Sequence, residues 1–435
     1  MKLKIDSRKI NKGDTFVSVR DDNKYVSEAI KNGATKVVVE SGIYDVETLV
    51  VDDVNKYIED YLEENYYDEI KDIKLIGVTG TNGKTTTSYL IYEALNKLGV
   101  KCAYIGTIGF YTPKRVEDTL NTTPTLYEIY EMLLECIKEG IEYVSMEVSS
   151  HGLDMGRVNG LEFEYGIFTN LTEDHLDYHK TMENYALAKQ KLFKQCKKSI
   201  INIDDKYKDY FLNRDSITYG KDDCDYKISD INISSNGSSF KLNNEEYNCK
   251  LIGEYNIYNM TCVIIVLKLM GLNTNVIKEL SAPKGRMEII PYKSNTIIID
   301  YAHTPDAVEK ILTEVSKLLH NKIITMIGCG GDRDKFKRPI MGDIATKYSD
   351  FVIFTTDNPR GEKPKRILKD ITCKLYKKNY KIITKRKKAI KKCIQKLRKG
   401  DILLLLGKGH EEYQIIKNKK IFFSDKEEVL KFTRR

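Results

Sequence analysis

Long apolar runs and paired cysteines are absent from this 435-residue sequence. The longest apolar stretches, at 262–270 and 402–406, are far shorter than the roughly 20 residues that a membrane-spanning helix needs. The N-terminal MKLKIDSRKI has no apolar segment behind its basic residues, so a signal peptide is not expected. The nine cysteines form no CxxC pair, which argues against a disulfide scaffold and against a cysteine zinc site. We therefore expect a cytoplasmic protein with no membrane partner and with reduced, mostly buried thiols.

Acidic residues are scarce in one segment of the chain. Residues 363–400 hold 17 Lys or Arg against a single acid, Asp370, although the net charge of the whole chain is only +8. A block of this kind could bind nucleic acid. It contains only two aromatic residues, Tyr376 and Tyr380, and no nucleic-acid-binding motif. We interpret it as a solvated helix surface and expect no nucleic-acid partner.

Strand-like and helix-like segments alternate along most of the chain, which is typical of α/β domains with parallel sheets. The segment 225–252 differs, because apolar and polar residues alternate there around an Asn236-Gly237 turn signal. We expect it to form a small antiparallel β element appended to the central domain. Length and pattern together predict three domains: a small N-terminal α/β module at 1–72, a central parallel-sheet domain at 73–282, and a doubly wound domain at 283–435.

The stretch IGVTGTNGKTTTS, at 76–88, predicts a phosphate-binding loop. An apolar strand precedes it and an amphipathic helix follows, so backbone N–H groups and the helix N-terminus would face an anion. Only two residues separate Gly80 from Gly83, whereas the general Walker A pattern has four before its Gly-Lys-Thr. Lys84 would neutralise the β- and γ-phosphates of a nucleotide, and Thr85 would reach Mg²⁺.

Three further candidates are weak when each is considered alone. Glu147 ends a predicted buried strand, where a carboxylate needs an ion pair or a metal. His175 and His179 are four residues apart, a spacing that metal sites share with ordinary helices. Lys189 lies on a mildly apolar helix, and by itself it is most simply a solvated lysine.

These motifs, in this order and at these distances, resemble the Mur ligases of cell-wall synthesis. The similarity covers essentially the whole chain, and its motifs are TGTNGKTT, MEVSSHGL, NLTEDHLDYH, ALAKQKLF, GEYNIYN, GRME, DYAHTPDA, GCGGDRDKFKRPIMG, DNPRGE and GKGHEEYQ. The branch it most resembles makes the UDP-MurNAc-tripeptide. The resemblance implies a three-domain fold and an ATP-dependent amide ligation. In that reaction the γ-phosphate activates a substrate carboxylate as an acyl phosphate, which an amine then attacks.

The resemblance also implies roles for individual residues. The ATP site would hold Mg²⁺ and would contain Gly80, Thr81, Asn82, Gly83, Lys84, Thr85, Thr86, Asn256, Arg286 and Asp300. The metal ligands would be Thr85, Glu147, His175 and a carboxylated (carbamate) Lys189, and Lys84, Glu147, His175 and Lys189 would be the catalytic set. The substrate UDP-MurNAc-L-Ala-D-Glu would be bound by Ser7, Asn121, Thr122, Thr123, Ser149 and Arg157. Met155 stands where members of this branch often have glutamine.

The DNPRGE stretch at 357–362 resembles the form that accepts meso-diaminopimelate. An arginine can grip the distal carboxylate of that amino acid with two parallel hydrogen bonds, and lysine lacks such a carboxylate. Arg360 is the candidate, although it could instead pair with Glu362. The same resemblance implies that the amino acid is bound by Arg333, Asp357, Asn358, Pro359, Arg360, Gly407 and Glu411.

Three alternatives to this hypothesis remain at the level of sequence. The ligase could add L-lysine or another diamino acid. It could be an amide ligase of the folylpolyglutamate or cyanophycin type, although DNPR and GKGHE argue against that. It could also be a nucleotide-dependent switch or a nucleic-acid-binding ATPase that uses residues 363–400. We expect a monomeric ligase.

Overall fold

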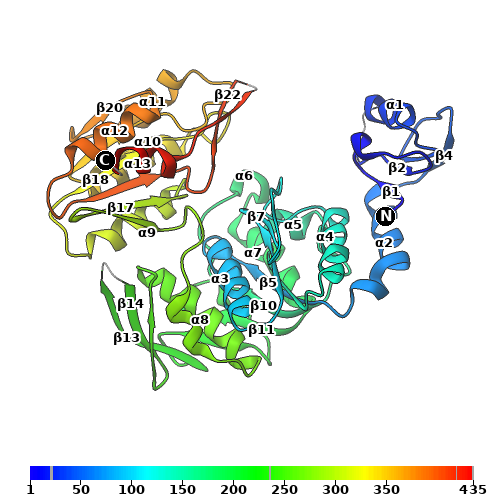
Figure 1. Ribbon diagram of the computed structural model, residues 1–435, viewed down its shortest axis with the longest axis horizontal. Coiled ribbons are helices and arrows are strands. Elements are labelled where there is room, and N and C mark those ends of the chain that lie inside the picture. Colours follow the sequence, from blue (N-terminus) through cyan, green and yellow to red (C-terminus); the bar gives the residue numbers. More distant parts are fainter. Residues whose placement is uncertain (20–22, 235–236, 418, 434–435) are drawn as a thin grey trace. The chain divides into compact units, whose positions relative to one another are not determined.

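The computed structural model describes residues 1–19, 23–234, 237–417 and 419–433 (Figure 1). Its contacts divide the chain into two compact units. The first comprises Met1–Gly77, Gly99–Gly166 and Ala188–Lys197, and the second comprises Val78–Leu98, Ile167–Leu187 and Lys198–Arg435. The domain boundaries that we predicted from the sequence stay a prediction. Among the described residues, no helix is long and apolar enough to cross a membrane.

The first unit begins with a four-stranded parallel sheet in the order β1-β2-β3-β4. Its elements are β1 (Leu3–Lys4), η1 (Ser7–Lys9), β2 (Thr15–Val17), α1 (Asn23–Lys31), β3 (Lys36–Val39), β4 (Glu47–Val50) and α2 (Val54–Ile70). Val26 and Ala29 of α1 pack with Phe16 and Val37 of the sheet in one apolar cluster. The α/β character predicted for this module is confirmed. The strands β1 and β4 have a weak sequence signal, because one has two residues and the other has no buried side chain.

The remainder of the first unit surrounds the strand that carries Glu147. Its elements are β6 (Cys102–Gly106), β7 (Gly109–Tyr111), β8 (Val116–Glu117), α4 (Leu126–Lys138), β9 (Tyr143–Glu147), α5 (Ser150–Asp154) and η2 (Lys191–Lys194). The strands β6 and β9 are parallel, whereas β7 pairs antiparallel with both β6 and β8. A capping box between Thr125 and Glu128 starts α4, because each side chain accepts from the backbone N–H of the other residue.

The largest sheet has the strand order β15-β14-β13-β12-β11-β10-β5-β9-β6-β7-β8. Its other strands are β5 (Lys74–Thr79), β10 (Phe163–Phe168), β11 (Cys196–Asn202), β12 (Ile217–Gly220), β13 (Tyr226–Ser234), β14 (Gly237–Leu242) and β15 (Glu245–Cys249). The predicted antiparallel element is confirmed as β13–β15. It extends this sheet, because β13 also pairs parallel with β12. Of its predicted turn, Asn236 lies outside the described residues.

The helices of the central part of the chain follow or precede these strands. They are α3 (Lys84–Lys97), α6 (Leu176–His179), α7 (Met182–Gln190), η3 (Lys208–Tyr210), α8 (Glu254–Leu269) and η4 (Thr274–Glu279). Helix α8 is apolar around most of its circumference and is almost entirely buried. It therefore forms part of the core rather than an amphipathic cover.

The C-terminal sheet has the order β16-β17-β21-β18-β19-β20, with β16 antiparallel and the other pairs parallel. Its strands are β16 (Glu288–Tyr292), β17 (Asn295–Asp300), β18 (Ile323–Ile327), β19 (Phe351–Phe354), β20 (Tyr380–Ile382) and β21 (Ile402–Leu406). The other elements are α9 (Pro305–Ser316), α10 (Lys337–Tyr348), α11 (Pro364–Thr372), α12 (Arg386–Lys396), β22 (Tyr413–Ile416), β23 (Lys419–Phe422) and α13 (Asp425–Thr433).

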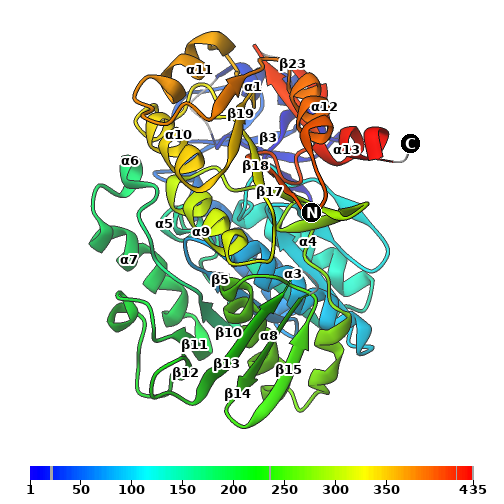
Figure 2. The same ribbon diagram turned by 90° about the vertical axis from the view of Figure 1, so that its left-hand side faces the viewer.

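Both faces of this sheet are covered, as the doubly wound prediction requires. Alternate strand residues belong to two apolar clusters: Leu404 packs with α9, α10 and α11, and Leu403 packs with α12 and α13. Figure 2 shows α9 and α10 on one side of β18 and β19 and α12 and α13 on the other. In such sheets a ligand binds beyond the carboxyl ends of the strands, which here end at Asp300, Ile327, Phe354 and Leu406.

Candidate active site

The predicted phosphate loop lies between β5 and the first turn of α3. Gly80 and Gly83 have φ angles of +147° and +88°, a range that side chains disfavour. A Cβ atom on Gly80 would come within 2.0 Å of Thr169 Oγ1, so the loop is closely packed as well as left-handed. The Lys84 Nζ donates to the carbonyl oxygens of Gly80 (2.8 Å) and Thr81 (2.9 Å). This geometry places an ammonium group and a helix N-terminus at the same loop, an arrangement that suits a phosphate.

Residues far along the chain meet this loop within the second unit. Arg286 Nη2 donates to Thr85 Oγ1 (3.1 Å), and Asn82 Nδ2 donates to Asp306 Oδ2 (2.9 Å). The predicted Asn256 reaches the same helix through one intermediate, because Asn259 donates to Asn256 Oδ1 and accepts from Thr87. The structure therefore brings the loop, Asn256 and Arg286 together.

Asp300 lies at the end of β17, beside Arg286 in the chain's tertiary structure. Its carboxylate accepts from the N–H groups of Met287 (2.7 Å) and Ala302 (2.7 Å). Burial raises the pKa of Asp300, while the Arg286 guanidinium and these two N–H donors act in the opposite direction. The predicted ATP-site residue Asp300 thus holds the backbone next to Arg286 in place.

The sequence did not predict the aromatic cluster that lies beside Arg286. The ring of Tyr301 lies 4.7 Å from the guanidinium carbon of Arg286, and its centroid is 4.6 Å from that of His303 and 5.0 Å from that of His410. Burial lowers the pKa of His410 to about 3 and also lowers that of His303, so both rings are uncharged at neutral pH. The motifs DYAH and GKGH contain these residues, but neither motif reveals that the rings lie against one another.

In the first unit, Glu147 is a completely buried carboxylate at the end of β9. Its Oε1 accepts from the Tyr104 hydroxyl (2.6 Å) and from the Thr107 N–H (2.8 Å), and its Oε2 accepts from the Thr107 hydroxyl (3.2 Å). The predicted Thr122 joins this network through Thr107, since their hydroxyls are 3.0 Å apart. Buried carboxylate and hydroxyl oxygens are the hard ligands that Mg²⁺ prefers, so the residue types fit the ion.

Thr123, Ser149 and Arg157 form a second network next to Glu147. Thr123 Oγ1 donates to the carbonyl of Glu147 (2.9 Å) and accepts from the Ser149 N–H (2.9 Å). Arg157 Nη1 donates to the Thr123 carbonyl (2.9 Å), and its Nη2 lies 3.3 Å from the sulfur of Met155. The structure therefore places three residues predicted to bind the UDP-sugar peptide in one hydrogen-bonded group.

Two further residues, Asn121 and Ser7, are predicted for that substrate site. Asn121 is exposed, one residue before Thr122. Ser7 is buried in the N-terminal module, where its hydroxyl donates to Glu28 (2.6 Å) and its carbonyl accepts from Asn32 (2.9 Å).

The remaining predicted metal ligands differ in exposure. His175 is about half exposed and adopts a left-handed conformation before the four-residue helix α6, whereas His179 at its end is buried. Lys189 on α7 is only 1% exposed. The interpretation of Lys189 as a solvated side chain is therefore wrong. Glu147 and Lys189 belong to the first unit and Thr85 and His175 to the second, and their joint role as metal ligands stays a prediction.

The predicted amino-acid site lies at the ends of β19 and β21 in the C-terminal sheet. Asn358 Nδ2 donates to Glu411 Oε2 (2.8 Å), and the buried Lys408 lies against both side chains. Gly407 has a φ of +105°, and a Cβ atom there would lie 2.9 Å from Asp357 Oδ2. Four of the predicted residues therefore form one polar cluster.

Arg333 lies in the loop between β18 and α10, and Arg360 lies in the loop between β19 and α11. A Cβ atom on Gly330 would lie 2.9 Å from Arg360 Nη1, 3.7 Å from Arg333 Cγ and 3.9 Å from the Asn358 carbonyl oxygen. The carbonyl of Pro359 accepts from the N–H of Glu362 (2.9 Å) and helps to close this turn. Arg333, Arg360 and Asn358 therefore approach one another at Gly330, and their role in binding the amino acid stays a prediction.

The alternative partner proposed for Arg360 is wrong. Arg360 Nη1 donates to the carbonyl of Gly331 (3.0 Å), and its backbone has a φ of +48°. Glu362 instead pairs with the completely buried Arg338, whose Nη2 lies 2.6 Å from Glu362 Oε1. Arg360 therefore lies beside Arg333 and does not pair with Glu362.

Two family models match the chain: "Mur ligase middle domain" over residues 78–267 and "Mur ligase, glutamate ligase domain" over residues 285–409. The chain belongs to the Mur ligase family. The predicted family and α/β fold class are confirmed. The chain is 42% identical to the UDP-N-acetylmuramoyl-L-alanyl-D-glutamate--2,6-diaminopimelate ligase of Clostridium perfringens (strain 13 / Type A), over 98% of this chain and 93% of that protein. It is 40% identical to the ligase of the same name in Aquifex aeolicus (strain VF5), over 98% and 92%.

Solved structures of Mur ligases agree with this membership. A structure of a UDP-N-acetylmuramoyl-L-alanyl-D-glutamate--2,6-diaminopimelate ligase is 33% identical, has a TM-score of 0.69, and is matched over 99% of this chain and 94% of that one. The MurF ligase from Thermotoga maritima in complex with ADP has a TM-score of 0.70 at 17% identity, over 99% and 96%, which shows the shared fold alone.

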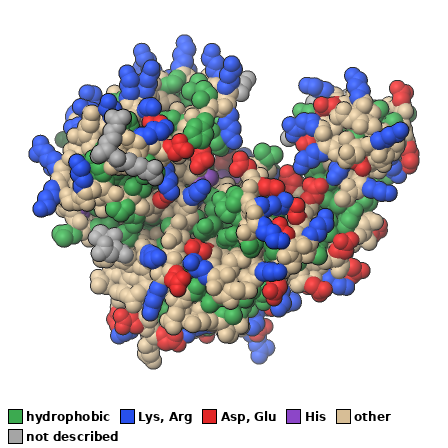
Figure 3. Space-filling model, in the orientation of Figure 1, with side chains coloured by type: hydrophobic (Ala, Val, Ile, Leu, Met, Phe, Trp, Pro, Cys, Tyr) green, Lys and Arg blue, Asp and Glu red, His purple; other side chains and the backbone are tan. Residues whose placement is uncertain are grey.

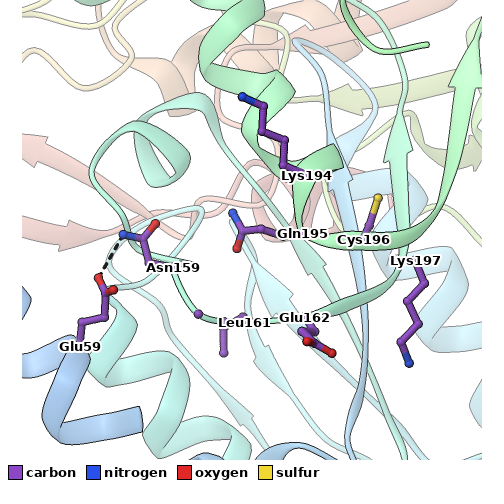
Figure 4. A pocket seen from close by; sticks show the side chains of 9 residues that line it. Glu59, Asn159, Leu161, Glu162, Lys194, Gln195, Cys196 and Lys197 are labelled. Atoms are coloured by element: carbon purple, nitrogen blue, oxygen red, sulfur yellow. Dashed lines mark hydrogen bonds between the residues drawn. The ribbon is translucent and has the colours of Figure 1, made fainter. Parts of the chain in front are cut away.

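One cavity in the first unit is not built from the residues predicted for the Mur ligase site. It has a volume of about 580 Å³ and is lined by Glu59, Asn159, Gly160, Leu161, Glu162, Lys194, Gln195, Cys196 and Lys197 (Figure 4). Its one drawn hydrogen bond joins Asn159 to Glu59 (3.1 Å). The residues predicted to bind substrates lie instead at strand ends and loops.

Proposed function

We propose that this Mur ligase adds meso-diaminopimelate to UDP-MurNAc-L-Ala-D-Glu in an ATP-dependent reaction of peptidoglycan precursor synthesis. Relatives that are 42% and 40% identical over 98% of this chain carry this activity in their names. The γ-phosphate of ATP is transferred to the glutamate carboxylate of the nucleotide substrate. The amine of diaminopimelate attacks the acyl phosphate, an amide bond forms, and ADP and phosphate leave.

The observation that carries the choice of amino acid is the presence of two arginines and two acids in the loops that follow β18, β19 and β21. Arg333 and Arg360 flank Gly330, Asp357 shares a loop with Arg360, and Glu411 lies in the loop after β21. A ligand with both a carboxylate and an ammonium group at its far end matches this pattern. Lysine would bring no second carboxylate for the arginines to bind.

The phosphoryl-transfer end of the reaction is proposed to use the loop at 80–86. Lys84 neutralises phosphate charge as it builds up, while Arg286 and Asn256 complete the nucleotide site. Mg²⁺, held by Thr85, Glu147, His175 and a Lys189 carbamate, would supply positive charge between two anions. Thr122, Thr123, Ser149 and Arg157 would bind the UDP-sugar peptide, with Ser7 and Asn121 at its other contacts.

We further propose that the enzyme acts in the cytoplasm as a monomer. Addition of L-lysine or another diamino acid is the nearest alternative, since the same loops would accept its amine. A folylpolyglutamate-type activity is less favoured, because a folylpolyglutamate synthase matches at 14% identity, which shows the fold alone.

The test is phosphate release from ATP and Mg²⁺ with UDP-MurNAc-L-Ala-D-Glu, comparing meso-diaminopimelate with L-lysine. We expect release with diaminopimelate and at least about tenfold less efficient release with lysine, the equivalent of one charged contact. Release with lysine alone would keep the ligase and discard the diaminopimelate assignment. An absence of release with both amines would overturn the proposed function.

Two variants locate the specificity. Arg360→Met removes the proposed carboxylate contact and should raise the KM for diaminopimelate by about tenfold or more, with little change for lysine. Arg366→Met is the matched control, because Arg366 is an exposed arginine on α11. Equal effects of the two substitutions would contradict the role of Arg360.

A further inference from the structure

Lys408 follows β21 almost directly, and its side chain has no exposed surface. A buried ammonium group is costly unless it is paired and hydrogen-bonded. Its Nζ lies 2.9 Å from Glu411 Oε2, 3.2 Å from Asn358 Oδ1 and 3.6 Å from Asp357 Oδ1. All three partners are predicted to bind the amino acid, but Lys408 itself has no assigned role.

The Lys408 ammonium helps to orient Asn358. The Asn358 Oδ1 accepts from Lys408 Nζ and from the N–H of Ile415 (3.0 Å), and Nδ2 donates to Glu411 Oε2. Two donors against one end of an amide require the carbonyl oxygen there, since an amide nitrogen would face them without an acceptor. Lys408 therefore helps to set which way the Asn358 side chain points.

The cluster retains acceptor atoms for a ligand. Asp357 Oδ1 is buried and has no hydrogen-bond partner among the described residues. The hydrogen bonds that described side chains donate to the Glu411 carboxylate both end on Oε2. Two carboxylates against one ammonium leave one negative charge, which a single ammonium group of a ligand would balance.

We propose that Lys408 is a positioning residue that makes this cluster selective for one ammonium group at the far end of the incoming amino acid. It acts through Asn358 and Glu411, and the idea rests on the proposed function. Without the lysine charge, repulsion between the neighbouring Asp357 and Glu411 carboxylates would favour a proton on one of them. That proton competes with the ligand's ammonium group.

Other titratable groups around the cluster do not change charge near neutral pH. Arg386 stays protonated in its buried pair with Asp425. Burial raises the pKa of Tyr301 and that of Cys329 to about 12, and lowers that of His410 to about 3. A new pH dependence in a Lys408 variant would therefore report on the two carboxylates.

The experiment measures the KM for diaminopimelate and kcat across roughly pH 6 to 8 in the full-length Lys408→Gln variant, which keeps hydrogen-bond donors but loses the charge. We expect the KM of the variant to be about tenfold higher than that of the wild type, with kcat within about threefold of the wild type. Within the variant, the KM should decrease as the pH increases. The wild-type KM should be nearly flat over this range.

The matched control is Lys420→Met. Both lysines approach the ring of Tyr413, Lys420 at 3.9 Å and Lys408 at 5.5 Å, but Lys420 is exposed. The control should behave as the wild type. A Lys408→Gln enzyme with unchanged KM and a flat pH profile, or with reduced kcat alone, would overturn the proposal.

A double variant covers the case in which Lys408→Gln does not fold. Lys408→Gln with Glu411→Gln removes one positive and one negative charge together, so the pH profile of KM should be flat again. A pH-dependent KM in the double variant would overturn the proposal. If the wild type releases no phosphate in response to diaminopimelate, the proposed function itself is wrong.

Discussion

Lys189 lies on α7 with only 1% of its surface exposed. A lysine cation is expensive to bury, whereas a carbamate formed from a neutral amine and CO₂, with release of a proton, carries oxygens that a cation can bind. We predict that Lys189→Met lowers kcat/KM by at least about a hundredfold, since it removes a proposed metal ligand. Phosphate release at saturating Mg²⁺ measures this effect.

The control for Lys189 stands two residues away. Lys191 is exposed and pairs with Asp154 (2.9 Å), so Lys191→Met should change activity by less than about twofold. If the carbamate forms, wild-type activity should also fall in CO₂-depleted buffer and return with bicarbonate. Full activity of Lys189→Met would exclude a catalytic role for this residue.

Single-residue roles were the hardest part to infer from the sequence. The helix around Lys189 is only mildly apolar, so the local pattern favoured a solvated side chain and only the family resemblance indicated otherwise. The Glu362 partner could not be found either, because Arg338 is 24 residues away in the chain. Burial and long-range pairing are tertiary properties, and neither leaves a local signature.

The helices α10 and α11 are joined by an ion network around the buried Arg338. Arg338 at the start of α10 contacts Glu362 (2.6 Å) and Asp370 of α11 (2.8 Å). Hydrogen bonds from Arg338 lower the pKa of Glu362 to about 2, well below its ordinary value. The network fixes the turn that carries Arg360, because Glu362 also accepts from the N–H of Asp332 (2.8 Å).

The depressed pKa of Glu362 has a defined effect on stability. A group with a lowered folded pKa stabilises the fold above its unfolded pKa, and this contribution is lost as pH falls toward the folded value. We predict that Glu362→Gln lowers the free energy of unfolding by about 2 kcal/mol at neutral pH. The difference from the wild type should shrink between about pH 4.5 and pH 2.

Urea denaturation at a series of pH values checks this prediction. Glu47→Gln is the control, because Glu47 pairs with Lys36 at a mostly exposed site and should contribute less than about 0.5 kcal/mol. A difference between Glu362→Gln and the wild type that is independent of pH would refute the ionic origin of the stabilisation.

Element by element, the longer segments were predictable and the short ones were not. Helices such as α3 and α4 carry apolar residues at helical spacing, and buried strands such as β5 and β21 are continuous apolar runs. The three-residue β20 lies inside the lysine-rich segment, where the charge pattern hides it. Its position follows from pairing with β19, which is non-local.

At the scale of the whole molecule, the order of motifs identified the family more strongly than any single motif did. The fold class followed from alternation of strands and helices, and the C-terminal sheet confirms it with helices on both faces. The continuation of the largest sheet into β13–β15 was not predictable from composition. The parallel pairing of β12 with β13 consists of only two residue pairs, Tyr219 with Tyr226 and Gly220 with Lys227.

The last prediction concerns the basic segment 363–400 and its response to RNA. Its lysines are exposed on α11 and α12, whose inner faces pack on opposite sides of the C-terminal sheet, and blue side chains crowd that part of the surface in Figure 3. Simple electrostatics predicts weak RNA binding at about 50 mM salt that is mostly lost by about 200 mM. We predict that RNA does not stimulate ATP hydrolysis at either salt concentration.

Phosphate release with and without polyuridylate, in the absence of the peptide substrate, measures this directly. A solvated surface leaves hydrolysis at background, because the reaction needs an acceptor carboxylate beside the nucleotide. Stimulation by RNA that persists at about 200 mM salt would point to specific recognition and to the nucleic-acid-dependent ATPase alternative. Under the ligase hypothesis, hydrolysis rises only when both UDP-MurNAc-L-Ala-D-Glu and the amino acid are present.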